Sequence, residues 1–186
     1  MSVMTSDPVE AAEQVIRVDG NDRPLGPAGK LEVHQTGELH RAGSVFLVDR
    51  SGRLLLQRRA LSKYHSPGLW ANACCGHPRP GEAPLEAAAR RLQEEVGLKA
   101  VLFPAFTTLY DAPVGAGLRE HEFVHVFFGR HDGPATPNPD EVAETAWRSP
   151  EALVRELDAR HAVWLHHYMD AHGGDVRTWT ARLTGV

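Results

Sequence analysis

The sequence predicts an α/β domain in which helices pack on a mixed β-sheet. Three observations predict this class. Two β-rich runs in residues 43–59 flank a turn at residues 49–52, which is a strong hairpin signal. An amphipathic helix is predicted over residues 84–96, and further strands are predicted after it.

The elements are taken in chain order. Residues 1–13 are polar and acidic and are expected to form a flexible tail, which leaves 14–186 as a single domain. EQVIRV, residues 13–18, predicts a short strand, and the turn-forming residues of 19–29 end it. After the hairpin, a long connection rich in Gly and Pro leads to the helix.

The helix over residues 84–96 has Pro84 in its first turn and Gly97 as its stop signal. Glu94 and Glu95 are polar positions expected to lie off its apolar stripe. The residues expected to be buried recur at helical spacing: Leu85, Ala89, Leu92 and Val96.

Strands are predicted at 101–110, 120–129 and about 143–147. Ser149 suits the N-cap of a helix with Pro150 at its first position. Helical sequence continues to Gly173 and Gly174.

Composition excludes several classes of function. The net charge of −4 and the scattered Lys and Arg residues show no general attraction to nucleic acid or anionic membranes. The sequence has neither a transmembrane run nor a signal peptide, so a cytoplasmic location is expected. Cys74 and Cys75 are adjacent and are the only cysteines, which excludes a disulfide scaffold and a redox pair with two intervening residues.

Residues 76–98, GHPRPGEAPLEAAARRLQEEVGL, resemble the Nudix signature, a loop–helix–loop whose carboxylates hold divalent cations on a diphosphate. The resemblance implies a Nudix-like α/β/α sandwich. Arg91 stands where the hydrolase pattern has Glu. A cation at this position weakens a multi-metal hydrolytic cluster and suits a site that grips a diphosphate without cutting it.

A second group of side chains has the character of a metal site. Glu120 and Glu122 are two residues apart in a strand and therefore share a face, which Val124 and Val126 continue as apolar. Buried paired carboxylates need a cation or a shared proton. With three histidines they form a plausible octahedral set for Mn²⁺, Mg²⁺ or Zn²⁺: His34, His40, His77, Glu120 and Glu122.

Four segments together resemble the type 1 isopentenyl-diphosphate isomerases, over roughly residues 14–170. They are KLEVHQTGELH, QRRALSKYHSPGLWANACCGHPRPGE, LYDAPVGAGLREHE and DEVAETAWRSP. The resemblance implies a monomeric enzyme of isoprenoid biosynthesis that moves a double bond between isopentenyl diphosphate and dimethylallyl diphosphate.

The resemblance also implies roles for particular residues. Cys75 is the catalytic thiol, and the three histidines and two glutamates are the inner metal ligands. Glu95 and the main-chain carbonyl of Cys75 hold a Mg²⁺ that also binds the substrate diphosphate. Basic residues surround the diphosphate, and two aromatic residues line the pocket: Lys30, Arg59, Lys63 and Arg91, then Tyr110 and Trp164.

The reaction needs an acid and a base around a carbocation, and Cys75 and Glu122 are the candidates. Tyr110 is expected to relay or orient the proton. Trp164 offers a π face to the cation, and it equally suits a core anchor of the C-terminal helix. Two other classes stay open at this point: a Nudix hydrolase of a nucleoside diphosphate derivative, and a non-catalytic diphosphate-binding module. A structural zinc site is weaker, because the cysteines lack suitable spacing.

Overall fold

The computed structural model describes residues 13–185. The expected tail, residues 1–13, lies outside the described residues except for Glu13. The elements in chain order are β1 (Gln14–Val18), β2 (Pro24–Gly29), α2 (Lys30–Thr36), β3 (His40–Val48), β4 (Leu54–Arg59), β5 (Trp70–Asn72), β6 (Cys74–Gly76), α3 (Pro84–Val96), β7 (Leu102–Gly115), β8 (Leu118–Arg130), β9 (Val142–Arg148), α4 (Pro150–Glu156) and α5 (Val163–Thr184).

Strand β3 is the centre of the sheet. It pairs in parallel with β8 from His40↔Glu122 to Val48↔Arg130, and it pairs antiparallel with β6. β8 also pairs antiparallel with the long strand β7. A turn carries the chain from β3 into β4, which pairs with β5 and β9, and the β1–β2 hairpin joins the other end of β3. The predicted mixed sheet is confirmed.

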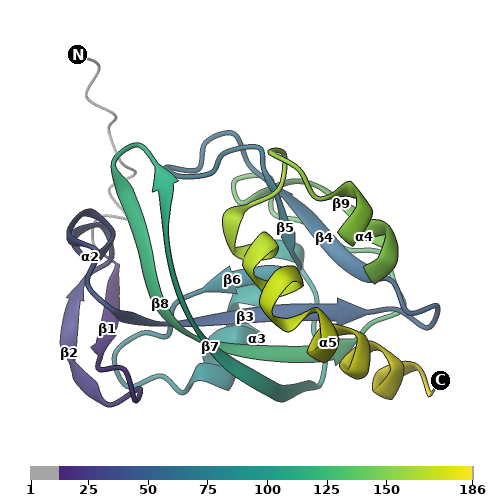
Figure 1. Cartoon of the computed structure of the whole chain (residues 1–186), viewed down its shortest axis with the longest axis horizontal. Helices are drawn as coiled ribbons and strands as arrows, with labels where there is room; N and C mark the ends of the chain where they lie inside the picture. The colour runs from purple at the N-terminus through teal and green to yellow at the C-terminus, as the bar shows by residue number, and fades with distance from the viewer. Residues whose placement is uncertain (1–12, 186) are drawn as a thin grey trace.

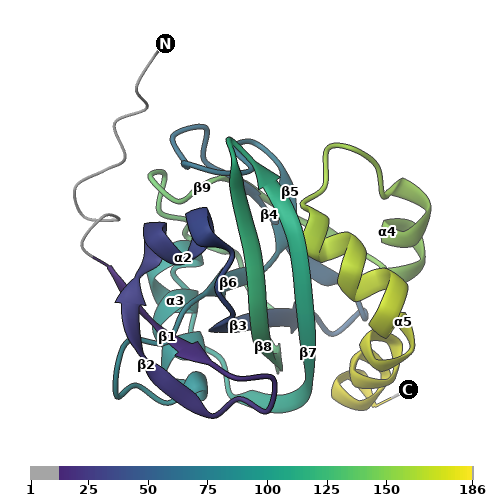
Figure 2. The same cartoon turned by 60° about the vertical axis from the view of Figure 1, so that its left-hand side comes forward.

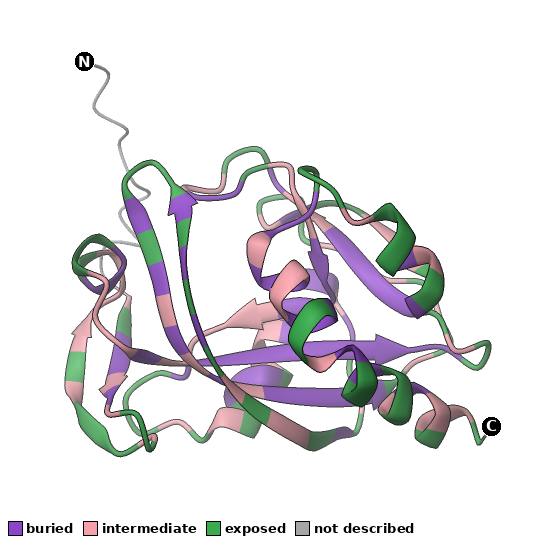
Figure 3. Ribbon diagram, in the orientation of Figure 1, coloured by how far each residue is buried: buried purple, intermediate pink, exposed green. Residues whose placement is uncertain are grey.

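Helices cover the two faces of this sheet. In Figure 1, α5 crosses in front of the strands and α3 lies behind them, and the turned view in Figure 2 separates the layers. Each face has its own core cluster: Phe46, Phe128 and Tyr168 pack on the α5 side, and Val45, Leu47 and Leu92 pack on the α3 side. Figure 3 shows β3 buried along its length between them. Among the described residues, no helix has the length and apolar composition needed to cross a membrane.

The predicted α3 helix is confirmed at both ends, and its buried stripe is confirmed at Leu92 and Val96. Gly97 takes a left-handed φ of 67° and ends the helix. The stripe is wrong at its start, because Leu85 is 43% exposed and Ala89 is also exposed. Ala88 and Glu95 are buried in their place. Because a carboxylate belongs to the buried face, apolar periodicity alone misplaced that part of the stripe.

Several short elements were not predicted. β2 lies in the segment read as turns, because an edge strand tolerates proline and pairs through its backbone with β1. α2 follows it directly, and β5 and β6 interrupt the segment read as one long connection. α5 runs past Gly173 and Gly174 to Thr184, with one non-helical residue at His172. Burial of Val176 and Thr180 outweighs the poor helix propensity of the glycines.

Candidate active site

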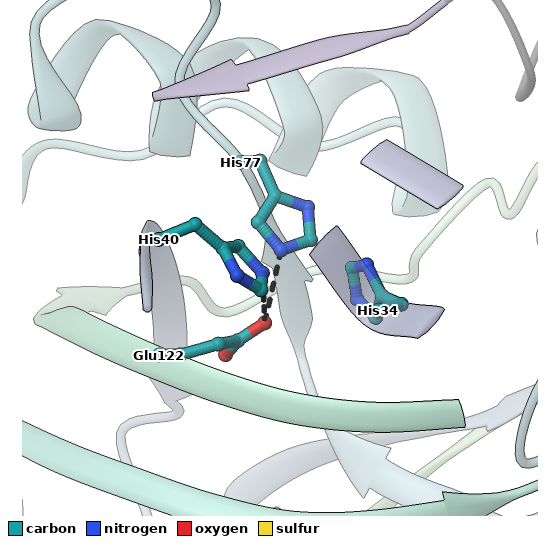
Figure 4. Close-up of side chains that lie close together, drawn as sticks. All are labelled: His34, His40, His77 and Glu122. Atoms are coloured by element: carbon teal, nitrogen blue, oxygen red, sulfur yellow. Dashed lines mark hydrogen bonds and ion pairs between the residues drawn. The ribbon is translucent and has the colours of Figure 1, made fainter. Parts of the chain in front are cut away.

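Three elements bring the three predicted histidines together. His34 lies in the last turn of α2, His40 begins β3, and His77 follows β6. The His34 ring centroid is 4.9 Å from that of His40 and 5.5 Å from that of His77, and the centroids of His40 and His77 are 5.0 Å apart. Figure 4 shows their rings and Glu122 converging.

Contacts with backbone carbonyl groups orient the rings of His34 and His40. His34 Nδ1 lies 2.7 Å from the Lys30 carbonyl oxygen, and His40 Nδ1 lies 2.8 Å from that of Glu38. A carbonyl only accepts, so each Nδ1 carries the hydrogen and each Nε2 offers a lone pair. Within the described part of the chain, both Nε2 atoms are buried without a hydrogen-bond partner. Two buried, unpartnered imidazole nitrogens beside a carboxylate fit a divalent metal ion.

Glu122 completes this group. His77 Nε2 lies 2.9 Å from Glu122 Oε1, and His40 Nε2 lies 3.6 Å from the same oxygen. One ligand atom from each of His34, His40, His77 and Glu122 falls within 4.8 Å of all the others. Burial alone would raise the pKa of Glu122, but the contacts with His40 and His77 lower it well below its ordinary value.

Glu120 lies on the same face of β8 as Glu122 and joins a second, adjoining group with His34 and His65. The predicted shared face is thus confirmed, with Glu120 and Glu122 both buried and His121 less so. Burial, followed by the charge of Glu122, raises the pKa of Glu120 well above its ordinary value. In the absence of a cation, Glu120 therefore keeps a proton to higher pH than an ordinary glutamate.

A cavity opens beside the histidines and collects most of the predicted site residues. The predicted residues that line it are Lys30, Arg59, Lys63, Cys75, His77, Arg91, Glu95, Glu120, Glu122 and Trp164. Three of the four basic side chains already contact carboxylates. Lys30 Nζ lies 2.8 Å from Glu13 Oε2, and Lys63 Nζ lies 3.0 Å from Glu141 Oε2.

Arg91 is the third of these cations, and it bridges α3 to the cavity. Its Nη2 donates to Glu95 Oε1 at 2.7 Å and lies 3.3 Å from Glu141 Oε1. Burial opposes the charge of Arg91, but Glu95 and the other nearby acidic groups raise its pKa, so it stays cationic. Gly76 makes room for this side chain, since a Cβ at Gly76 would lie 2.9 Å from Arg91 Cγ.

The two adjacent cysteines have different surroundings, because successive residues of a strand point to opposite faces. Cys74 is buried in the core cluster on the α3 side, with Sγ 3.6 Å from Glu95 Oε1. Cys75 faces the cavity, and its Sγ lies 3.3 Å from both Ser44 Oγ and Asn72 Oδ1. Burial raises the pKa of Cys75, so this thiol is protonated at neutral pH.

Of the two predicted aromatic residues, Trp164 lines the cavity and Tyr110 does not. Tyr110 pairs with Glu122 across the β7–β8 ladder, and burial followed by the charge of Glu120 raises its pKa. Among the described residues, its hydroxyl has no well-formed hydrogen bond. Trp164 is only 3% exposed and belongs to the core cluster that includes buried residues of α5. This burial agrees with the expected core anchor, and the expected role of Trp164 toward a cation stays a prediction.

Sequence reasoning missed residues that line the cavity, among them His65 and Glu141, and several that contact its lining residues. Ser44 and Asn72 contact the Cys75 thiol, Glu141 holds Lys63 and Arg91, and Gln57 Nε2 donates to Glu95 Oε2 at 2.6 Å. His65 lies in KYHSPG, part of one of the segments that carry the family resemblance, but no spacing rule links it to the other histidines. Small polar residues in strands carry no distinctive pattern, so only the folded arrangement reveals these partners.

Comparisons with known proteins agree with this geometry. A sequence model of the NUDIX domain family matches residues 38–168. The isopentenyl-diphosphate Delta-isomerase 2 of Aromatoleum aromaticum is 50% identical over 161 residues, which cover 85% of each chain. The isopentenyl-diphosphate Delta-isomerase of Streptomyces griseus is 50% identical over 172 residues, covering 90% of this chain and 87% of the relative.

Solved structures share the fold at lower identity. DR0079 of Deinococcus radiodurans superposes with a TM-score of 0.67 at 23% identity, over 81% of this chain and 91% of its own. A MutT protein of Methanosarcina mazei gives a TM-score of 0.59 at 20% identity, over 77% of this chain and 94% of its own.

Proposed function

Because this chain belongs to the NUDIX domain family and, within it, to the isopentenyl-diphosphate Delta-isomerases, we propose that it interconverts isopentenyl diphosphate and dimethylallyl diphosphate. The observation that carries the proposal is the content of one cavity. A protonated thiol, an ionised carboxylate beside three histidines, and four basic side chains all meet there.

The reaction adds a proton to one carbon of an alkene and removes one from another. Protonation of the terminal carbon of isopentenyl diphosphate gives a tertiary carbocation, and loss of a proton from the neighbouring methylene gives dimethylallyl diphosphate. The reaction therefore needs one proton donor and one proton acceptor that both face a small cavity. Cys75 carries a proton and Glu122 does not, so this pair supplies both roles and exchanges them with reaction direction. Tyr110, across the ladder from Glu122, orients the proton at this carboxylate.

The metal ligands are proposed from the donor sets. His34, His40, His77, Glu120 and Glu122 would hold one divalent ion, and their mixed nitrogen and oxygen donors suit Mn²⁺ or Zn²⁺. Glu95 and the main-chain carbonyl of Cys75 would hold a Mg²⁺ together with the substrate diphosphate. Bound cations would neutralise diphosphate charge and tune the acidity of the carboxylates.

The basic side chains hold the diphosphate end of the substrate. Arg59 forms no ion pair with a described carboxylate. Its Nη2 donates to the His65 carbonyl at 3.2 Å, and its Cζ lies 5.3 Å from the Trp164 ring centroid. Lys30, Lys63 and Arg91 are positioned by their acidic partners. Trp164 places an aromatic ring on the same cavity, where it stabilises positive charge on the hydrocarbon.

The hydrolase alternative is not favoured. Arg91 places a cation beside Glu95 and Glu141, where a hydrolytic site would need a further carboxylate to hold several metal ions. Hydrolysis also gives no role to the Cys75 thiol. We further propose that the protein acts as a monomer in the cytoplasm on this small diphosphate, without nucleic acid or membrane partners.

The test is incubation of the purified chain with isopentenyl diphosphate, Mg²⁺ and Mn²⁺ in D₂O, followed by NMR. Formation of deuterated dimethylallyl diphosphate by the wild type, lost in Cys75→Ala, is the expected result. Cys74→Ala is the matched control, since it removes the neighbouring thiol from the opposite face, and it should keep isomerising. Released phosphate would indicate a hydrolase, and unlabelled, intact substrate would leave a binding module.

A further inference from the structure

His65 is a buried histidine of the cavity that has no role in the mechanism above. It lies in the connection between β4 and β5 and is 7% exposed. Its Nε2 is 3.6 Å from Glu120 Oε1, and its ring stacks near His34 with centroids 5.8 Å apart. Its ring centroid also lies 6.0 Å from that of Trp164. His65 therefore adjoins both the proposed metal ligands and Trp164.

The two ring nitrogens of His65 have different neighbours. Ser66 Oγ lies 3.4 Å from Nδ1, and a hydroxyl can donate a hydrogen bond as well as accept one. Nε2 faces the Glu120 carboxylate, so a ring hydrogen on Nε2, with the Ser66 hydroxyl donating to Nδ1, satisfies both contacts.

The backbone holds His65 in this place. Ser66 has a φ of 48°, a left-handed conformation that is strained for a non-glycine residue. Arg59 Nη2 donates to the His65 carbonyl at 3.2 Å, which ties the loop to β4. Because this buried loop is tied to β4 and strained at Ser66, we infer that the fold fixes the position of the His65 ring.

We propose that His65 is a positioning residue that directs its Nε2–H to the Glu120 carboxylate and so orients Glu120 toward the metal bound by His34. The inference rests on the metal site of the proposed function. A carboxylate bound to a cation only accepts hydrogen bonds, so an N–H is the complementary partner. The separation of 3.6 Å is longer than a hydrogen bond, and a small rotation of either side chain closes it.

The donor atoms of His34, His40, His77 and Glu122 lie mutually within 4.8 Å, and Glu120 and His65 form an adjoining group with His34. Within that adjoining group we assign ligation to the carboxylate and positioning to the imidazole, because Glu120 shares the buried face of β8 with Glu122. Partners of metal-bound carboxylates and imidazoles fix ligand orientation, and their loss typically weakens metal binding 10–100-fold.

The experiment compares Mn²⁺ binding by the metal-free full chain and its variants, with free Mn²⁺ followed by EPR. His65→Ala should raise the Mn²⁺ Kd by about 10–100-fold, and His65→Gln, whose amide can donate an N–H, should recover much of the loss. His161→Ala is the matched control: His161 is 9% exposed, contacts Asp158 and does not line the cavity, so its Kd should match the wild type. Excess Mn²⁺ should restore kcat in His65→Ala with KM for isopentenyl diphosphate unchanged.

Electron spin-echo measurements on the bound Mn²⁺ count the coupled histidine nitrogens and separate the remaining outcomes. An equal count in the wild type and His65→Gln supports positioning, whereas loss of one nitrogen makes His65 a ligand and overturns it. A Kd within about twofold of the wild type in both His65 variants also overturns it. A wild type that binds Mn²⁺ through His65-dependent contacts but fails to isomerise would refute the proposed function and leave this inference standing.

Discussion

The buried histidine of α2 makes the stability of the metal-free protein depend on pH. Burial, aided by His77 and His40, lowers the pKa of His34 from 6.5 to about 3. Between these two values the unfolded chain binds a proton that the folded chain does not. The contribution of His34 to folding stability therefore falls as the pH falls below 6.5.

The size of this pH effect follows from the protonation of His34 in the unfolded chain. At pH 5 the folded ring is neutral and the unfolded ring is almost fully protonated, which lowers the free energy of unfolding by about 2 kcal/mol relative to pH 7. This value holds for any folded-state pKa below about 4, because the folded ring is neutral at pH 5 in every such case. Glu120 acts in the opposite sense. Its raised pKa keeps a proton on the folded protein, so its contribution falls as the pH rises above 4.5.

Urea unfolding in EDTA at pH 5 and pH 7 measures the effect. The gain in free energy of unfolding from pH 5 to pH 7 should be about 2 kcal/mol larger in the wild type than in His34→Gln. Glu120→Gln should increase the gain, because it removes the opposing titration. Equal gains in the wild type and His34→Gln, to within about 0.5 kcal/mol, would refute the account of His34.

Three further predictions concern the cavity. Arg91→Gln leaves the buried Glu95 without its cation and removes one of the two cations at Glu141, which keeps Lys63, so we expect a loss of about 3 kcal/mol in urea unfolding and a raised KM for substrate; unchanged values would mean that the pairs are dispensable. Because the pKa of Glu120 is raised in the metal-free protein, Mn²⁺ binding should release protons, measured by calorimetry in buffers of different ionisation enthalpy, and Glu120→Gln should release fewer; equal release by the two proteins would contradict this account. Trp164→Ala should lower kcat about thirtyfold, corresponding to about 2 kcal/mol of cation–π stabilisation, whereas Trp164→Phe should keep part of it; equal kcat values for the two variants would argue for a purely structural tryptophan.

The sequence predicted the parts of the fold that depend on local signals. The β3–β4 hairpin, both ends of α3 and the Ser149 cap appear where turn residues, periodicity and capping residues placed them. The burial of Leu85 was predicted wrongly, because periodicity assumes that every polar residue faces water. Glu95 is 3% exposed. Helical spacing reveals Arg91, one turn earlier, as its partner, but no local pattern reveals Gln57 of β4 as the other.

The candidate site was predictable where residues belong to motifs and unpredictable where they act through contacts. Ten predicted residues line the cavity, because their spacing matched that of a known family. His65, Glu141 and Asn72 belong to connections or short strands, and their positions depend on tertiary packing. The roles of all these residues remain predictions for the experiments above.

The pairing of β3 with β8 has a consequence for how the protein reaches its native state. His40 and Glu122 are direct partners in a parallel ladder between segments far apart in the chain, and such pairings form slowly. A slip of one residue would turn Glu120 and Glu122 to the opposite face of the sheet. Only the native register then presents the full set of proposed ligands, so a divalent ion that binds this set would stabilise that register over slipped ones. Refolding with Mn²⁺ would then give a larger yield of native protein than refolding in EDTA.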